Sequence, residues 1–117
     1  TIALFANARL HLGLDSYANH LTHYHWEYER FVRRVPAIIL WGSTQASAQG
    51  YDHNTNISLN LPCQPCFRED PAISRMPRGP CINPLGQTYA EPRHACMLGI
   101  EAGRVVQAVK ELWNRTF

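Results

Sequence analysis

Four cysteines are the residues of this sequence whose spacing most directly suggests chemistry. Cys63 and Cys66 form a C-x-x-C pair, and Cys81 and Cys96 follow, each after 14 intervening residues. A C-x-x-C turn can direct two thiolates at one ion, and two later thiolates can complete a tetrahedral site for zinc or a single iron. Because four thiolates leave no open coordination position for a substrate, we expect one metal ion with a structural role.

The segment that contains these cysteines is also rich in proline. Seven of the eight prolines lie between Pro62 and Pro92, so neither a long helix nor a central strand is expected there. A bound metal would supply the cohesion that the polar loops of this segment lack. Two alternatives stay open: two disulfides, which need an oxidising compartment, and four unrelated thiols.

A second group of polar residues stands where a predicted strand passes into a predicted helix. Asp15 and Ser16 follow the short strand Arg9–Gly13 and begin a helix that runs to about His25, with His20 one turn inside it. The N–H groups of a helix start, the Ser16 hydroxyl and the His20 imidazole suit a diphosphate, and Asp15 can accept hydrogen bonds from sugar hydroxyls. The simpler interpretation is a helix cap with a surface histidine.

Another polar loop, Gly42-Ser43-Thr44, directly follows the apolar run Pro36–Trp41. A run without a polar face is typical of a parallel strand that is covered on both sides. Ligands of open parallel sheets bind beyond the carboxyl ends of the strands, so this loop and Asp15–His20 are predicted to lie at the same edge. A Gly-Ser-Thr loop alone is weak evidence for a ligand.

The remaining elements predict an α/β sheet layered by helices. Thr1–Asn7 is expected to end a helix, and Asn56–Leu61 alternates as a strand near an edge of the sheet. Glu101–Trp113 is predicted to be a helix with one apolar stripe, formed by Val105, Val106, Val109, Leu112 and Trp113. The histidines of the first part of the chain are predicted to face solvent: His11, His20, His23 and His25.

These elements divide the chain into three parts. Residues 1–62 are expected to be the ligand-binding α/β part, residues 63–96 the irregular cysteine segment, and residues 97–117 a helix that packs on the sheet.

The length and the net charge of the chain limit the number of domains and the kinds of partner that are expected. With 117 residues beginning at Thr1, the chain is expected to be one domain or a fragment of a larger cytoplasmic protein, with no secretion leader. A net charge of +2 gives little attraction to nucleic acid or to an anionic membrane. The longest apolar run, Val35–Trp41, is too short to cross a bilayer. The oligomeric state stays open, a homo-oligomer included.

In their order along the chain, these residues resemble the C-terminal part of glycosyltransferase family 9, the ADP-heptose heptosyltransferases. Within that family they look like the branch that glycosylates bacterial autotransporter adhesins. The likeness covers nearly the whole chain, including the final helix, and is carried by Gly13-Leu14-Asp15-Ser16, Asn19-His20-Leu21-Thr22, Ile39-Leu40-Trp41-Gly42-Ser43-Thr44, Gly50-Tyr51, Asn54-Thr55-Asn56-Ile57, Cys63-Gln64-Pro65-Cys66, Cys81 and His94-Ala95-Cys96-Met97.

The resemblance implies the GT-B fold, in which two Rossmann-like domains enclose a cleft and the C-terminal one binds the nucleotide-sugar. This chain would then be a partial Rossmann-like C-terminal domain with an irregular four-cysteine metal finger. Asp15, Ser16 and His20 match the family motif Asp-Ser/Thr-Gly-x-x-His, which contacts the diphosphate and the sugar. Tyr17 replaces the glycine of many members, so the backbone would approach the phosphate less closely. The cysteine segment resembles an iron-binding finger, so iron and zinc both remain candidates.

The resemblance also implies an inverting transfer of a heptose or a similar sugar to a protein Ser/Thr hydroxyl or a glycan, in the bacterial cytoplasm. The acidic catalytic residue and a lysine that binds the nucleotide-sugar would belong to segments that this chain does not contain, since Lys110 of the last helix is its only lysine. We therefore expect no catalytic residue in the chain. The alternative is a non-catalytic four-cysteine metal ribbon that serves as an interaction module, with arginines and acidic residues mixed in its loops.

Overall fold

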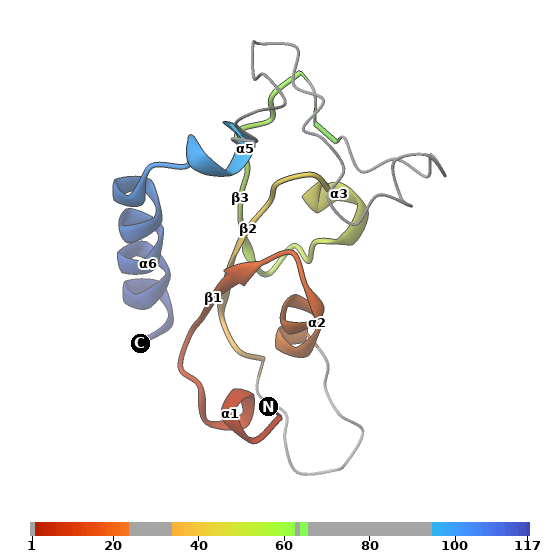
Figure 1. Cartoon of the computed structure of the whole chain (residues 1–117). Coiled ribbons are helices and arrows are strands. Elements are labelled where there is room, and N and C mark those ends of the chain that lie inside the picture. Colours follow the sequence, from red (N-terminus) through yellow and green to blue (C-terminus); the bar gives the residue numbers. More distant parts are fainter. Residues whose placement is uncertain (1, 24–33, 63, 66–94) are drawn as a thin grey trace.

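Strands and helices alternate along the chain in the computed structural model, which describes residues 2–23, 34–62, 64–65 and 95–117 (Figure 1). The elements are α1 (Ile2–Asn7), β1 (His11–Leu14), α2 (Tyr17–His23), β2 (Ala37–Leu40), α3 (Ala46–Gln49), β3 (Thr55–Ile57), α5 (Ala95–Leu98) and α6 (Ala102–Thr116). They form a small mixed α/β domain, compatible with a fragment of a Rossmann-like fold.

The sheet is parallel, as predicted. Within the described residues it has three strands in the order β1-β2-β3, so β2 is the central one. Leu12 of β1 lies beside Ile38 of β2, and Ile39 of β2 lies beside Asn56 of β3. All strands therefore end at the same edge of the sheet, where the loops after β1 and β2 begin.

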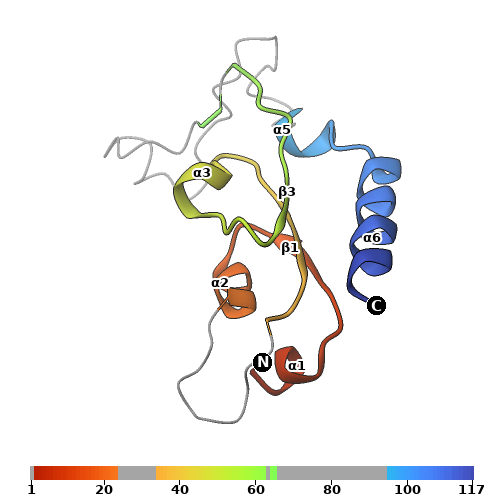
Figure 2. The same ribbon diagram turned by 180° about the vertical axis from the view of Figure 1, so that it is seen from behind.

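Helices cover both faces of β2, which explains its continuous apolar sequence. Ala37, Ile39 and Trp41 pack together on one face with Ala46 of α3. Ile38 belongs to a second cluster on the opposite face. Figures 1 and 2 show α6 on one side of the sheet and α2 with α3 on the other. The prediction of a strand buried on both sides is confirmed.

The helix predicted over Glu101–Trp113 is α6, and three members of its predicted stripe face the core. Val105, Val109 and Leu112 pack toward Ile38 and Ile57 of the sheet, and Leu112 is buried. No helix among the described residues combines the length and the apolarity needed to cross a lipid bilayer.

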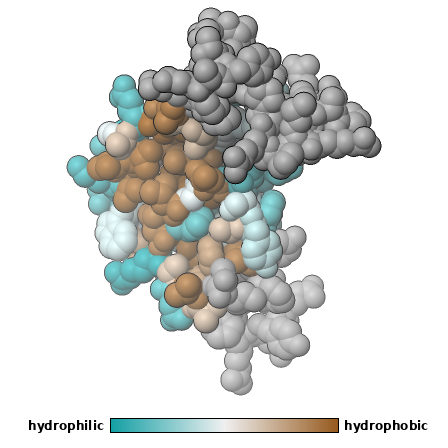
Figure 3. Space-filling view, viewed as in Figure 1, coloured by the Kyte–Doolittle hydropathy of each residue, from teal (hydrophilic) through white to brown (hydrophobic). Residues whose placement is uncertain are grey.

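Two members of the predicted stripe do not face the core. Val106 is 51% exposed and Trp113 is 40% exposed, because α6 packs mainly against β2 and β3. On the same face of the sheet, Leu12 and Leu14 of β1 are also exposed, since α6 does not cover this strand. Figure 3 shows the apolar surface that results on the face seen in Figure 1.

The strand predicted over Asn56–Leu61 is wrong in its extent, because β3 ends at Ile57. The Ser58 hydroxyl accepts a hydrogen bond from the backbone N–H of Asn60 at 3.1 Å, and Asn60 has a φ of 51°. This local turn competes with the strand ladder, and asparagine tolerates the left-handed conformation that the turn requires. The position at an edge of the described sheet is confirmed.

His11 is the first residue of β1, and the prediction that it faces solvent is wrong. Its ring lies 5.1 Å from that of Phe5, and its Nε2 atom is buried without a hydrogen-bond partner among the described residues. Burial lowers the pKa of His11 below its ordinary value of 6.5, because desolvation disfavours the imidazolium.

We predict that this histidine makes the domain sensitive to mild acid. Below pH 6.5 the unfolded chain binds a proton at His11 more readily than the folded chain does, so stability falls as the pH falls through this range. Urea unfolding between about pH 5 and 8 should show a shallower loss of stability for His11→Phe than for the wild type. Parallel pH profiles of the two proteins would contradict the prediction.

Candidate functional site

The loops that follow β1 and β2 meet at the carboxyl edge of the sheet. Asp15 comes directly after β1, and Thr44 lies in the loop after β2. The Thr44 hydroxyl donates a hydrogen bond to the Asp15 carboxylate across 29 residues of sequence. The predicted proximity of the two polar loops is therefore present in the structure, because parallel pairing brings the ends of neighbouring strands together. We call Asp15, Ser16, His20 and Gly42-Ser43-Thr44 the Asp15 edge.

The hydrogen bond between Thr44 and Asp15 gives the two residues different roles. The Thr44 hydrogen is used on one oxygen of Asp15, so Thr44 holds the carboxylate in place. A carboxylate has about four acceptor sites on its two oxygens, and the second oxygen of Asp15 can still accept from a ligand. Asp15 is only partly exposed, whereas Ser43 is exposed at the surface of its loop.

Ser16 caps α2, as predicted. Its hydroxyl accepts a hydrogen bond from the backbone N–H of Ala18 at 3.3 Å, and its carbonyl accepts from Asn19 N–H at 2.9 Å. Accepting the first bond leaves the hydroxyl hydrogen of Ser16 able to donate to a ligand. The helix-cap interpretation is thus confirmed, and contact with a diphosphate stays a prediction.

His20 lies one turn after Ser16 on α2 and is partly buried. Its Nδ1 atom is 2.9 Å from the hydroxyl oxygen of Tyr51, which comes from the loop between α3 and β3. The next histidine of the helix, His23, stacks on the Tyr51 ring with the ring centroids 3.9 Å apart. The prediction that both histidines face solvent is wrong, because this tyrosine packs against them. His25 lies outside the described residues.

Gly42 lies where α5 approaches the loop after β2. A Cβ atom at this position would lie 2.9 Å from Met97 Sδ and 3.9 Å from Cys96 Sγ. The first distance is too short for a real contact, so a larger residue would have to displace the flexible Met97 side chain. The second places the last cysteine of the sequence beside the Asp15 edge.

Gln64, between Cys63 and Cys66, reaches the same loop. Its Nε2 atom donates to the carbonyl oxygen of Gly42 at 2.5 Å, and its Oε1 atom accepts from the backbone N–H of Leu61 at 2.7 Å. These bonds join Gln64 to the loop after β2, so Gln64 and Cys96 both lie close to Gly42.

One of the four predicted metal ligands, Cys96, belongs to the described residues. Cys63, Cys66 and Cys81 lie outside the described residues, and Cys96 is buried. The described residues alone contain no group of three possible metal ligands.

No protein-family model, curated protein or solved structure matches this chain. The function is therefore inferred from the side chains at the Asp15 edge.

Two residues of this region carry no signal of their own in the sequence. Tyr51 and Gln64 both act through contacts with residues distant in the chain, His20 and Gly42. Both lie within segments that resemble the heptosyltransferases, and that resemblance is the one feature that could have drawn attention to them.

Proposed function

We propose that the chain forms the nucleotide-sugar-binding part of a glycosyltransferase of the heptosyltransferase type. ADP-heptose would be the donor, and a protein Ser/Thr hydroxyl or a glycan would be the acceptor. In the intact enzyme the acceptor hydroxyl would attack the anomeric carbon, and ADP would leave. The group that activates the acceptor would come from outside this chain, so the chain alone would bind the donor without transferring its sugar.

One observation carries the proposal: the hydrogen bond from Thr44 to Asp15. It joins two segments that are far apart in the sequence and that both resemble family segments. It also lies beyond the carboxyl ends of parallel strands, where open α/β sheets bind nucleotides.

The side chains at this edge have the chemistry that a sugar diphosphate needs. The second oxygen of Asp15 can accept from sugar hydroxyls, since Thr44 uses only the first. The Ser16 hydroxyl and the His20 imidazole can donate to diphosphate oxygens. As negative charge grows on the departing diphosphate, such donors favour the transition state.

The metal of the proposal is structural. Cys63, Cys66, Cys81 and Cys96 would hold one iron or zinc ion, and four thiolates give it no position for substrate. Its effect on donor binding would be indirect. Gln64 and Cys96 lie against the loop at Gly42, so an ordered cysteine segment would help to hold that loop.

Titration of the purified chain with ADP and with ADP-heptose, followed by calorimetry, tests the proposal. We expect saturable binding of both. Asp15→Asn should weaken the binding of ADP-heptose by about 10- to 100-fold, since a hydrogen bond to a charged group is lost. Affinity for ADP alone should stay within about threefold, because Asp15 is assigned to the sugar.

Three further variants complete this experiment. Thr44→Val should reproduce part of the Asp15→Asn defect and Thr44→Ser should not, because serine keeps the hydroxyl that holds Asp15. Glu111→Gln removes a carboxylate from α6, on the opposite face of the sheet, and should bind like the wild type. Absence of any ADP-heptose binding would refute the proposal, and salt-sensitive binding of an oligonucleotide instead would favour the metal-ribbon module.

A further inference from the structure

Tyr51, in the loop between α3 and β3, contacts His20 of α2. Its hydroxyl oxygen is 2.9 Å from Nδ1 of His20, although 31 residues separate the two in the sequence. The two rings meet edge to face, with an interplanar angle of 89° and centroids 5.9 Å apart. This geometry directs the hydroxyl, which lies in the plane of the tyrosine ring, toward the imidazole nitrogen.

The plane of the Tyr51 ring is set by two further histidines. His23 stacks on it with an interplanar angle of 8° and a centroid distance of 3.9 Å. His53 lies 5.6 Å from the same ring and 5.1 Å from that of His23. Because the stack restrains rotation of the tyrosine, its hydroxyl has a defined direction.

Buried hydrogen bonds hold the backbone of this loop. The carbonyl oxygen of Tyr51 accepts from Asn54 N–H at 3.0 Å and from Asn56 Nδ2 at 3.2 Å. The Asn54 side chain donates to Asn19 Oδ1 of α2 at 3.1 Å, and Asn19 Nδ2 donates to the carbonyl oxygen of Gln49. Asn19 is fully buried and Asn54 nearly so, and breaking bonds between buried amides is costly. The loop is therefore fixed to the helix that carries His20 on both sides of Tyr51.

The hydrogen bond at Nδ1 decides what the other ring nitrogen of His20 can do. A neutral imidazole carries one hydrogen, and the tyrosine hydroxyl can donate to Nδ1 or accept from it, according to the tautomer. A tyrosine hydroxyl that donates to Nδ1 leaves the hydrogen on Nε2. An Nε2–H group can donate to a phosphate oxygen, whereas an unprotonated Nε2 would repel it.

Helix geometry places the His20 side chain on the same side of α2 as Ser16. Side chains of an α-helix lean toward its N-terminus, and residues four apart lie on the same face. His20 follows Ser16 by four residues, so its ring leans toward the end of α2 at which Asp15 and Ser16 lie.

We propose that Tyr51 is a positioning residue for His20: its hydroxyl donates to Nδ1, fixes the ring, and keeps the hydrogen on Nε2 for the diphosphate of the nucleotide-sugar. This inference rests on the proposed function. It adds a residue that the family motif at Asp15, Ser16 and His20 does not include.

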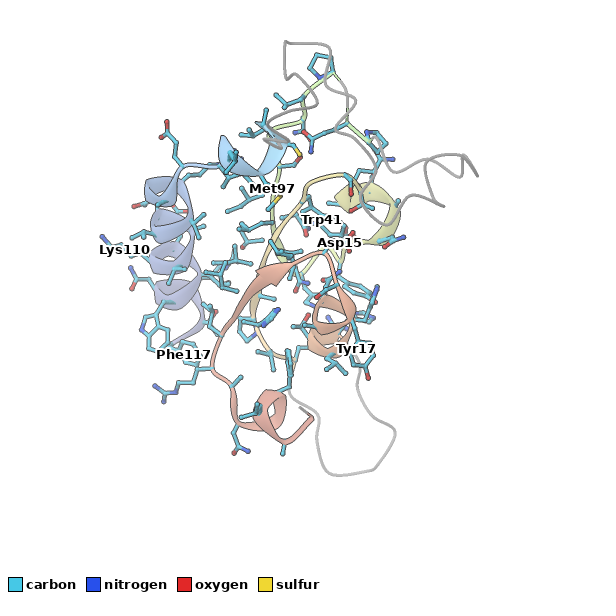
Figure 4. All side chains as sticks on the ribbon, in the orientation of Figure 1. Asp15, Tyr17, Trp41, Met97, Lys110 and Phe117 are labelled. Carbon is cyan, nitrogen blue, oxygen red and sulfur yellow. The ribbon has the colours of Figure 1, made fainter. Side chains whose placement is uncertain are left out.

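Tyr51→Phe tests it, since phenylalanine keeps the stacked ring and removes only the hydroxyl. We expect ADP to bind about 5- to 15-fold more weakly to this variant, the loss of roughly one hydrogen bond. In a His20→Ala background, the same change should have no further effect, because Tyr51 acts through His20. Lys110→Gln is the control and should bind ADP like the wild type: Lys110 is exposed, and Figure 4 shows it on α6, on the other side of the sheet from Asp15.

A second readout needs no ligand. Nitrogen-15 NMR of the histidine ring should show His20 of the wild type with its hydrogen on Nε2, and Tyr51→Phe should shift it toward a mixture of tautomers. If the wild type binds no ADP, the proposed function fails and this inference fails with it. Two outcomes would overturn only this inference, provided that the wild type binds ADP. In the first, Tyr51→Phe changes neither the affinity for ADP nor the tautomer of His20. In the second, Tyr51→Phe weakens ADP binding by the same factor in the His20→Ala background as in the wild type.

Discussion

Replacing Trp41 by alanine should lower the free energy of unfolding by about 3–5 kcal/mol, as expected for loss of a large core side chain. Trp41 is fully buried and packs with Ala37 and Ile39 on one face of β2. Its indole N–H also donates to Asn56 Oδ1 at 2.9 Å, so the substitution leaves that amide oxygen without this donor. Asn56 in turn holds the carbonyl of Tyr51, and the damage should therefore extend to the loop over His20.

Urea unfolding of the wild type and two controls measures this effect. Trp41→Phe keeps most of the apolar volume and loses the hydrogen bond, so we expect a smaller loss of about 1–3 kcal/mol, measurable even if the alanine variant does not fold. Trp113→Ala, at a partly exposed site on α6, should cost about 1 kcal/mol or less, mainly its contact with Arg9. If the alanine variants of Trp41 and Trp113 lost the same free energy of unfolding, the assignment of Trp41 to the core with Ala37 and Ile39 would be contradicted.

If the four cysteines hold a structural metal as proposed, replacing Cys96 by serine should remove it and destabilise the whole chain. Structural zinc sites contribute about 10–16 kcal/mol of apparent binding free energy in zinc-finger peptides, so loss of one thiolate ligand is expected to exceed a core substitution. Cys96 packs beside Gly42, and Gln64 reaches the same loop from the C-x-x-C segment. Under the proposed function, loss of the metal should therefore also weaken the binding of ADP at the Asp15 edge.

Elemental analysis and thermal unfolding check this prediction. The wild type should carry one iron or zinc per chain, Cys96→Ser should carry almost none, and its melting temperature should fall. Met97→Leu is the matched control, because it changes the neighbouring contact with Gly42 and leaves every thiol in place. A metal-free wild type with a mass four hydrogens below the reduced chain would show disulfides instead, and full metal content in Cys96→Ser would exclude this cysteine as a ligand.

The parallel sheet could be predicted because its central strand has an unambiguous sequence. Ala37–Leu40 has no polar face, which only burial on both sides explains. The end of β3 could not be predicted, since a bond from Asn60 N–H to the Ser58 hydroxyl decides it locally. The helices α3 and α5 have four residues each, too few to show a helical period.

The predictable part of the candidate site follows from topology. Asp15 and Thr44 each come after a strand, and parallel strands bring such positions together. The contacts of Tyr51 and Gln64 depend on side-chain packing between segments 31 and 22 residues apart, and no spacing in the sequence encodes them. The burial of the His11 ring nitrogen could not be predicted for a related reason. It depends on a contact with Phe5 of α1, whereas the leucines that alternate in β1, Leu12 and Leu14, stay exposed.

The parallel pairing of β1, β2 and β3 has a consequence for the order in which the parts of the chain fold. A hairpin cannot build such a sheet, because each strand must wait for a crossover segment to close before it finds its neighbour. Folds dominated by such distant pairings form slowly. The bond between Asp15 and Thr44 can form only after this step, so competence to bind a ligand would be among the last properties that a newly synthesised chain gains.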